Sequence, residues 1–195
     1  MKIYNPKSIW FTADTHFDHK NIIKYCNRPF NSIGEMNSAL IDNWNSVVKK
    51  DDLVIHNGDF CFGGFEAYQQ YRDELNGKII LIRGNHDKIQ TSQLCKIFGD
   101  VCDYLKISVA DNDLEEGWQK IIICHYAFRV WENCHHGSWN LYGHSHGTLD
   151  DDPNLLSIDI GVDCHKYTPI SYNQIKDIMS RKIFKPVDHH TRNKI

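Results

Sequence analysis

The chain has 195 residues, of which 41% are hydrophobic, and its formal net charge is −3. This length can bury one sizeable core and is short for two, so we expect a single domain over residues 1–195. The weakly acidic balance argues against a generic nucleic-acid or membrane surface, and no run approaches the roughly eighteen apolar residues of a transmembrane helix. The start of the chain lacks the apolar core of a signal peptide, and seven cysteines without Cys-x-x-Cys spacing are typical of free thiols. We therefore expect a cytoplasmic protein.

Strand-like and helical segments alternate in the first half of the chain. The longest helical pattern, residues 32–48, has apolar residues at helical spacing and begins with Ser32 and Glu35, which predict a capping box. In chain order we expect strand 8–13, helix 21–26, helix 32–48, strand 53–56, helix 65–75, strand 78–82 and helix 91–98.

Hairpin-like patterns dominate the second half. Two strand-like runs, 104–110 and 119–124, are joined by an acidic turn that contains glycine. Further strands are expected over 139–142 and 155–162, and a closing helix over 171–184. The whole pattern predicts an α/β domain with mixed sheets.

The most informative segment is Gly84-Asn85-His86-Asp87, which follows the continuous apolar run 78–82. Such a run is typical of a strand buried on both faces. In open α/β sheets, ligands bind at the carboxyl ends of the strands, where these polar groups are expected to lie. Taken alone, the tetrapeptide is compatible with an ordinary turn.

Four other predicted strands also end in residues that bind cations, which an ordinary turn does not explain. The resulting candidate metal ligands are Asp14, His16, Asp59, Asn85, His125, His144 and His146. They are too many for one tetrahedral zinc ion, and they suit two divalent ions that share a carboxylate. Nitrogen and oxygen donors without thiolate favour Mn²⁺ first, with Fe²⁺, Zn²⁺, Ni²⁺ or Co²⁺ as alternatives. Two such ions, ~3.5–4 Å apart, attract a phosphate and lower the pKa of a bridging water.

In their order along the chain, these motifs resemble the sequence blocks of the calcineurin-like metallophosphoesterases, and in particular the small bacterial and phage members. The resemblance implies a four-layer α/β/β/α sandwich of two mixed sheets with a two-metal site between the sheets. It implies that one metal is held by Asp14, His16, Asp59 and His146, and the other by Asp59, Asn85, His125 and His144, with Asp59 as the bridge. It also implies that His86 faces the substrate, stabilises the phosphoryl oxygens and protonates the leaving alkoxide.

One position departs from the family pattern. Many members have a second acid after the Gly-Asp motif, where it orients the catalytic histidine, and here Phe62 takes that place. Either His86 has no carboxylate partner, or Asp18 or Asp87 supplies one.

Substrate contacts are expected from the loop that follows His16. Arg28 is our candidate for a phosphate contact, because its planar guanidinium matches phosphate oxygens, and His19 is a second candidate. The segment 127–139, rich in aromatic residues and histidine, either forms a wall that stacks a nucleobase or packs locally under a long loop. The expected partner is a small phosphorylated substrate, with nucleotides among the candidates.

Three functions fit the sequence. The first is a metal-dependent phosphoesterase that hydrolyses phosphodiesters, and also phosphomonoesters, by means of a hydroxide that bridges the two metals. The second is a nuclease acting on DNA or RNA, which the net charge argues against, although Lys20, Lys24 and Arg28 form a local basic patch. The third is a non-catalytic binding module that keeps the fold. The oligomeric state is not predicted.

Overall fold

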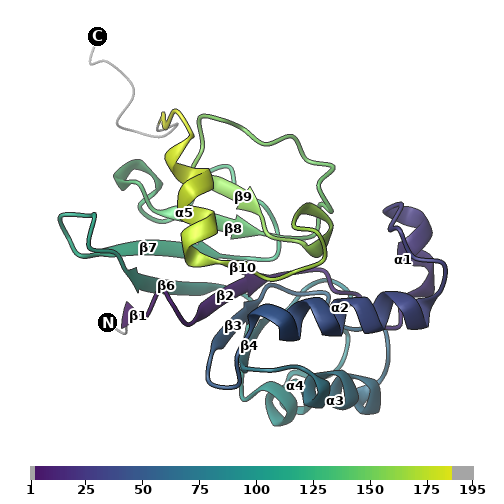
Figure 1. Ribbon diagram of the computed structural model, residues 1–195. Coiled ribbons are helices and arrows are strands. Elements are labelled where there is room, and N and C mark those ends of the chain that lie inside the picture. Colours follow the sequence, from purple (N-terminus) through teal and green to yellow (C-terminus); the bar gives the residue numbers. More distant parts are fainter. Residues whose placement is uncertain (1–2, 186–195) are drawn as a thin grey trace.

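Two five-stranded sheets form the centre of the computed structural model, which describes residues 3–185 (Figure 1). The strand order is β10-β2-β3-β4-β5 in the first sheet and β1-β6-β7-β8-β9 in the second, and both sheets mix parallel and antiparallel pairs. The strands are β1 (Ile3–Tyr4), β2 (Ile9–Thr12), β3 (Leu53–His56), β4 (Lys78–Ile82), β5 (Asp100–Cys102), β6 (Leu105–Ala110), β7 (Trp118–Ile123), β8 (Trp139–Tyr142), β9 (Ser157–Asp159) and β10 (Ile170–Ser171).

Helices flank these sheets, which confirms the predicted α/β fold. They are α1 (Lys20–Tyr25), α2 (Ile33–Val47), α3 (Phe65–Glu74), α4 (Thr91–Phe98) and α5 (Tyr172–Ser180), with short 3₁₀ turns η1 (Cys134–His136) and η2 (Val162–Cys164). In Figure 1, α2, α3 and α4 lie on one side of β3 and β4, and α5 lies on the other side of the molecule. No helix within residues 3–185 is long and apolar enough to cross a membrane.

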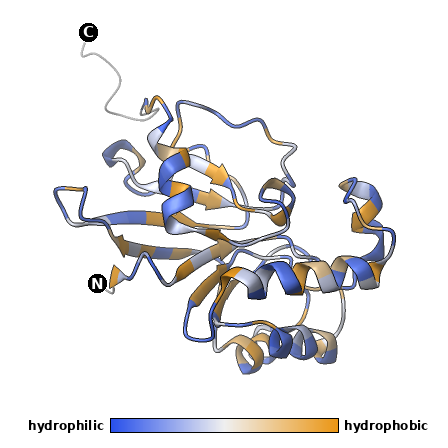
Figure 2. Cartoon of the chain, in the orientation of Figure 1, coloured by the Kyte–Doolittle hydropathy of each residue, from blue (hydrophilic) through white to orange (hydrophobic). Residues whose placement is uncertain are grey.

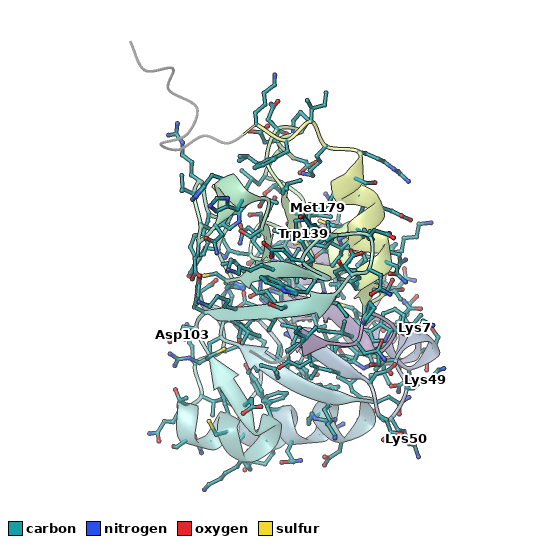
Figure 3. All side chains as sticks on the ribbon, turned by 90° about the vertical axis from the view of Figure 1, so that its left-hand side faces the viewer. Lys7, Lys49, Lys50, Asp103, Trp139 and Met179 are labelled. Atoms are coloured by element: carbon teal, nitrogen blue, oxygen red, sulfur yellow. The ribbon has the colours of Figure 1, made fainter. Side chains whose placement is uncertain are left out.

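Alternation along the strands builds two cores, one on each face of the first sheet. In β3, Val54 packs toward the helices, whereas Ile55 packs toward the second sheet. Figure 2 shows apolar residues concentrated along the strands, while the helices alternate apolar and polar residues. Trp139 of β8 and Met179 of α5 belong to the core that includes Ile55, and Figure 3 labels them close together. The predicted strand 78–82 contributes residues to both cores. It is buried on both faces, as its continuous apolar run indicates.

Helix α2 differs from the prediction only in its cap. The Ser32 hydroxyl accepts a hydrogen bond from the Glu35 amide at 3.1 Å, as expected. The Glu35 carboxylate, however, accepts from the Asn31 amide at 2.8 Å instead of reaching the Ser32 amide. A complete capping box occurs at α5, between Ser171 and Gln174.

Two predicted elements are shorter in the structure because tertiary contacts end them. Strand β9 ends at Asp159, and the chain then crosses to the first sheet, where the Val162 amide donates to the Ala13 carbonyl at 3.0 Å. Helix α5 ends at Ser180, and the Ile183 amide donates to the Pro153 carbonyl at 2.8 Å. The crossing after β9 places residues 160–164 beside the end of β2.

Candidate metal centre

The predicted ligands meet where the strands of both sheets end. Strands β2, β3 and β4 are parallel neighbours, and so are β7 and β8, so their carboxyl ends lie at common edges. The amide of His16 donates to the carbonyl of Asp59 at 2.9 Å, which joins the loops after β2 and β3. The amide of His144 donates to Asp14 Oδ2 at 2.9 Å, which joins the two sheets.

Most of these ligands have an unusual backbone conformation. The residues Asp14, His16, Asp59, His144 and His146 have φ between +48° and +66°, a region that costs energy for side chains other than glycine. Such strain clusters at functional sites, where the surrounding structure enforces it. Five of the ten non-glycine residues with positive φ within residues 3–185 are thus predicted ligands.

Glycines allow the loops to approach one another closely. A Cβ atom on Gly84 would lie 2.1 Å from Asp59 Oδ1, and one on Gly143 would lie 2.6 Å from Asp14 Oδ2. Both separations are impossible for real side chains, so glycine is required at both positions for the carboxylates to sit where they do.

The first cluster contains Asp14, His16 and His146, whose ligand atoms lie within 4.8 Å of one another. Asp14 and His16 are buried, and Asp14 Oδ1 and His16 Nε2 make no hydrogen bond with any described residue. Buried polar atoms almost always have a partner. A divalent cation satisfies both atoms at once, so these residues fit a metal ion.

The second cluster contains Asp59, His125 and His144, again with ligand atoms within 4.8 Å of one another. The side-chain oxygen of Asn85 lies 3.1 Å from His125 Nε2 and 2.8 Å from His144 Nδ1, which adds a fourth donor. The Nδ1 atom of His125 lies 2.8 Å from the Asn57 carbonyl, so its Nε2 is turned toward the cluster.

Asp59 lies between the two clusters. Its Oδ2 atom is 3.4 Å from His16 Nε2 and 3.5 Å from His125 Nε2, and these histidines belong to different clusters. Its Oδ1 atom accepts a hydrogen bond from the His86 amide at 2.8 Å, which fixes the orientation of the carboxylate. One carboxylate oxygen thus faces a ligand of each cluster.

Burial shifts the pKa values of these groups strongly. It raises the pKa of Asp14 to about 7 and lowers the pKa of His16 to about 2. Burial also opposes ionisation of Asp59, but the hydrogen bond with His125 and the other histidine contacts outweigh it and hold the pKa at about 2. Asp14 is thus a buried carboxyl group that ionises only near neutral pH, and His16 is held neutral. A bound cation would stabilise both side chains in place of the solvent that burial removes.

His86 is half-buried beside the first cluster. Its ring lies 5.3 Å from the His16 ring and 5.6 Å from the Phe62 ring. The Nδ1 atom of His86 is buried and makes no hydrogen bond to a described residue.

Neither of the two acids considered as partners for His86 reaches it. Asp18 accepts hydrogen bonds from Asn37 at 2.9 Å and Tyr71 at 2.6 Å. The carboxylate of Asp87 accepts from the Tyr68 hydroxyl at 2.6 Å and from the amides of Asp59, Phe60 and Gly84. Asp87 therefore holds the loops together, and no carboxylate within residues 3–185 accepts a hydrogen bond from Nδ1 of the His86 ring.

The guanidinium of Arg28 has no free donor for the predicted phosphate contact. Its guanidinium is buried and donates to both carboxylate oxygens of Asp163 at 2.8 Å. The remaining donors reach the carbonyls of Asp14 and Thr15 and the sulfur of Met36, so none is left for a substrate. Arg28 instead ties the loop after β2 to Asp163.

Asp163 is the functional residue that the sequence did not indicate. Its Oδ2 atom lies 2.7 Å from His146 Nδ1, so it orients this histidine as a carboxylate typically orients a metal-binding imidazole. Burial opposes protonation of His146, but the bond with Asp163 outweighs it and raises the pKa to about 10. The position of Asp163, within 3₁₀ turn η2, follows a strand pattern without a motif, so no local signal marks it.

The other predicted substrate contacts are His19 and the segment 127–139, and the structure places them differently. His19 is buried beside the site, with its Nδ1 atom 3.2 Å from His16 Nδ1, and its contact with substrate stays a prediction. In the segment 127–139, Trp131 and Trp139 are buried, and Trp139 stacks on Tyr172. These two tryptophans pack locally, and stacking of a nucleobase on the rest of the segment stays a prediction.

Comparisons with known proteins agree with this geometry. The family model of the calcineurin-like phosphoesterases matches residues 7–190. An uncharacterised protein of Methanocaldococcus jannaschii is 35% identical over 182 residues, which cover 90% of this chain and 93% of that protein. The gene 66 protein of Mycobacterium phage D29 is 25% identical over 186 residues, covering 84% of this chain and 92% of that protein.

A solved structure shares the fold. The crystal structure of a protein of unknown function from Aquifex aeolicus aligns with a TM-score of 0.66 and 24% identity, covering 87% of this chain and 98% of that one. The family match extends over nearly the whole chain and includes every predicted ligand. The chain therefore belongs to the calcineurin-like phosphoesterase family.

Proposed function

We propose that this chain is a phosphodiesterase that uses two divalent metal ions, with Mn²⁺ as the first candidate. Membership of the family supports metal-dependent phosphoester hydrolysis in general. The observation that carries the finer proposal is the position of Asp59 Oδ2 between the two ligand clusters. Two bound ions would act as Lewis acids on the phosphate and lower the pKa of a water between them.

The predicted ligands form two sets, one for each ion. Asp14, His16 and His146 would hold one ion, and Asn85, His125 and His144 the other, with Asp59 shared. Arg28 and Asp163 keep His146 in place.

His86 faces the substrate in this proposal, where its imidazole stabilises the phosphoryl oxygens and donates a proton to the leaving alkoxide. Since no carboxylate within residues 3–185 accepts from its Nδ1, no neighbouring acid orients the imidazole ring for this proton transfer.

Two cavities support a diester as the substrate. His86 lines a cavity of about 490 Å³, whereas its neighbour Asn85 lines another of about 430 Å³ together with His125 and Tyr126. A phosphodiester has two ester groups to accommodate and a monoester has one. The two cavities are lined by the adjacent residues His86 and Asn85. Together they provide space for both ester groups of a diester.

The burial of Arg28 weakens the nuclease alternative. Of the three basic residues in the loop after β2, only Lys20 and Lys24 are exposed. Recognition of a polynucleotide relies on several exposed cations along the backbone. A non-catalytic module is also disfavoured, because the chain keeps all seven predicted ligands and His86.

A metal-by-substrate screen tests the proposal. It compares p-nitrophenyl phosphate, bis-p-nitrophenyl phosphate, cyclic nucleotides and single-stranded DNA in the presence of Mn²⁺, Ni²⁺, Zn²⁺ or Mg²⁺. We expect diester hydrolysis to equal or exceed monoester hydrolysis with at least one metal. Activity confined to monoesters would contradict the proposal, and cleavage of DNA alone would favour the nuclease.

A further inference from the structure

The cavity beside His86 is lined by both apolar and polar side chains. Its volume of about 490 Å³ lies within the range of small-molecule sites. Its lining side chains include Phe62, Phe65, His86, Lys88, Gln90 and Gln93. The cavity adjoins the metal clusters through His86 and contains none of the predicted metal ligands.

Phe62 presents an open aromatic face at this cavity. The side of its ring that faces His19 is covered, because the two rings are stacked at 4.0 Å and are within 9° of parallel. Phe62 is nevertheless 50% exposed, which is high for a phenylalanine in a well-packed loop. His19 thus holds the phenyl ring in one orientation and leaves its other face available for a further planar group.

Two glutamines that line the cavity offer hydrogen bonds of the kind that nucleobases use. No described residue accepts a hydrogen bond from the side-chain amide of Gln90 or Gln93. A glutamine amide both donates and accepts, and this matches the edge of a nucleobase, adenine in particular. Lys88 is exposed at the same cavity and adds a cation that favours a phosphorylated ligand.

The position of His86 indicates which part of the substrate enters the cavity. In an in-line displacement, the leaving oxygen departs on the side opposite the attacking water. The residue that protonates or stabilises that oxygen lies next to the leaving group, and here that residue is His86. The cavity that His86 lines is therefore on the leaving-group side.

We propose that this cavity binds the nucleoside leaving group of the substrate, with its base stacked on Phe62 and its edge bonded to Gln90 and Gln93. The assignment to the leaving group rests on the proposed phosphodiesterase function, whereas binding of a nucleoside in the cavity does not. The two parts are tested separately.

Binding is tested with adenosine, which carries no phosphate and needs no metal. Saturation-transfer NMR and a chemical-shift titration measure its affinity for the wild type and for Phe62→Ala, Phe62→Leu and Gln93→Ala. Loss of base stacking predicts about tenfold weaker binding for Phe62→Ala. Phe62→Leu keeps an apolar side chain without the ring and should weaken binding nearly as much. Tyr104→Ala removes an exposed aromatic that lines neither cavity, and should change the affinity by no more than about twofold.

The second arm measures kcat/KM for a diester with an adenosine leaving group and for bis-p-nitrophenyl phosphate. Phe62→Ala should raise KM for the adenosine ester about tenfold and leave its kcat largely unchanged. Equal adenosine affinity in the wild type and both Phe62 variants would overturn the proposed subsite. If no ester is hydrolysed with any metal but Phe62→Ala still weakens adenosine binding, the phosphodiesterase function fails and the nucleoside site stands.

Discussion

Asp163 Oδ2 lies 2.7 Å from His146 Nδ1, although the two residues come from different loops. His146 also belongs to the cluster with Asp14 and His16. Arg28 holds Asp163 through two 2.8 Å hydrogen bonds and also binds the carbonyl of Asp14. A single guanidinium therefore links the orientation of one predicted metal ligand, His146, to the backbone of another, Asp14.

Substitution of Asp163 should weaken one metal site selectively. Loss of the partner that orients a ligating histidine typically lowers metal affinity by about 10- to 100-fold. Calorimetric titration of Asp163→Ala with Mn²⁺ should show this loss for one binding event and leave the other unchanged. Asp163→Asn keeps an acceptor for Nδ1 and should recover part of the affinity. Wild-type affinity at both sites in Asp163→Ala would refute the positioning role, and Asp73→Asn, an exposed acid on α3, is the control.

The two clusters predict different effects for Asp59 and Asn85. Asp59→Asn should weaken both metal sites, because its carboxylate lies between them. Asn85→Ala should mainly empty the second site, since among the described residues its oxygen is hydrogen-bonded to His125 and His144 alone. Metal content per chain after dialysis distinguishes the variants. If both variants lost the same part of their bound metal, Asp59 would not be shared between the two metal sites.

His86→Ala should separate catalysis from metal binding. A general acid contributes about 10²- to 10⁴-fold to a rate, so kcat should fall by roughly that factor while both metals stay bound. If His86 donates a proton, the loss should be larger for a nucleoside leaving group than for p-nitrophenyl, which hardly needs one. If it only stabilises phosphoryl charge, the two losses should be similar.

No carboxylate within residues 3–185 binds Nδ1 of the His86 ring, so the comparison of the two esters decides between these roles. The measurement is kcat/KM on both ester types, with metal content determined for each protein. Unchanged activity, or loss of a metal on substitution, would show that the role of His86 is assigned wrongly.

Asp111 predicts a pH-dependent contribution to stability away from the metal site. Burial alone would raise its pKa, but hydrogen bonds from Lys176 and Tyr172 outweigh this and lower it. A lowered pKa in the folded state means that the contribution is complete above the unfolded value of about 4 and is lost as the pH falls through the folded value. Asp111→Asn should thus reduce the free energy of unfolding by about 1–3 kcal/mol at pH 7.

Urea unfolding at pH 7 and at successively lower pH below 4 measures this difference. The gap between wild type and Asp111→Asn should shrink as the pH falls. Asp177→Asn, an exposed acid on the same helix as Lys176, should behave as wild type. If the difference in the free energy of unfolding grew at low pH, the Asp111 carboxylate would not stabilise the folded state in the way predicted.

The sequence reveals the parts of the site that are local in the chain. Each predicted ligand directly follows a strand pattern, and parallel pairing of those strands brings their ends together. The Arg28–Asp163 pair spans 135 positions, and only the crossing of the chain after β9 brings it together. Strands β1, β5 and β10 contain only two or three residues, too few for any periodicity, and they form by pairing with longer neighbours. The end of α5 is likewise set by backbone contacts with residues 153–154.

The central claim is that catalysis needs two ions shared through Asp59, and a metal titration of activity tests it most directly. Metal-free protein is titrated with Mn²⁺ under tight-binding conditions while hydrolysis of bis-p-nitrophenyl phosphate and bound metal per chain are measured on the same samples. We expect activity to increase until two ions are bound per chain. Full activity in protein that contains a single ion per chain would contradict the two-metal account.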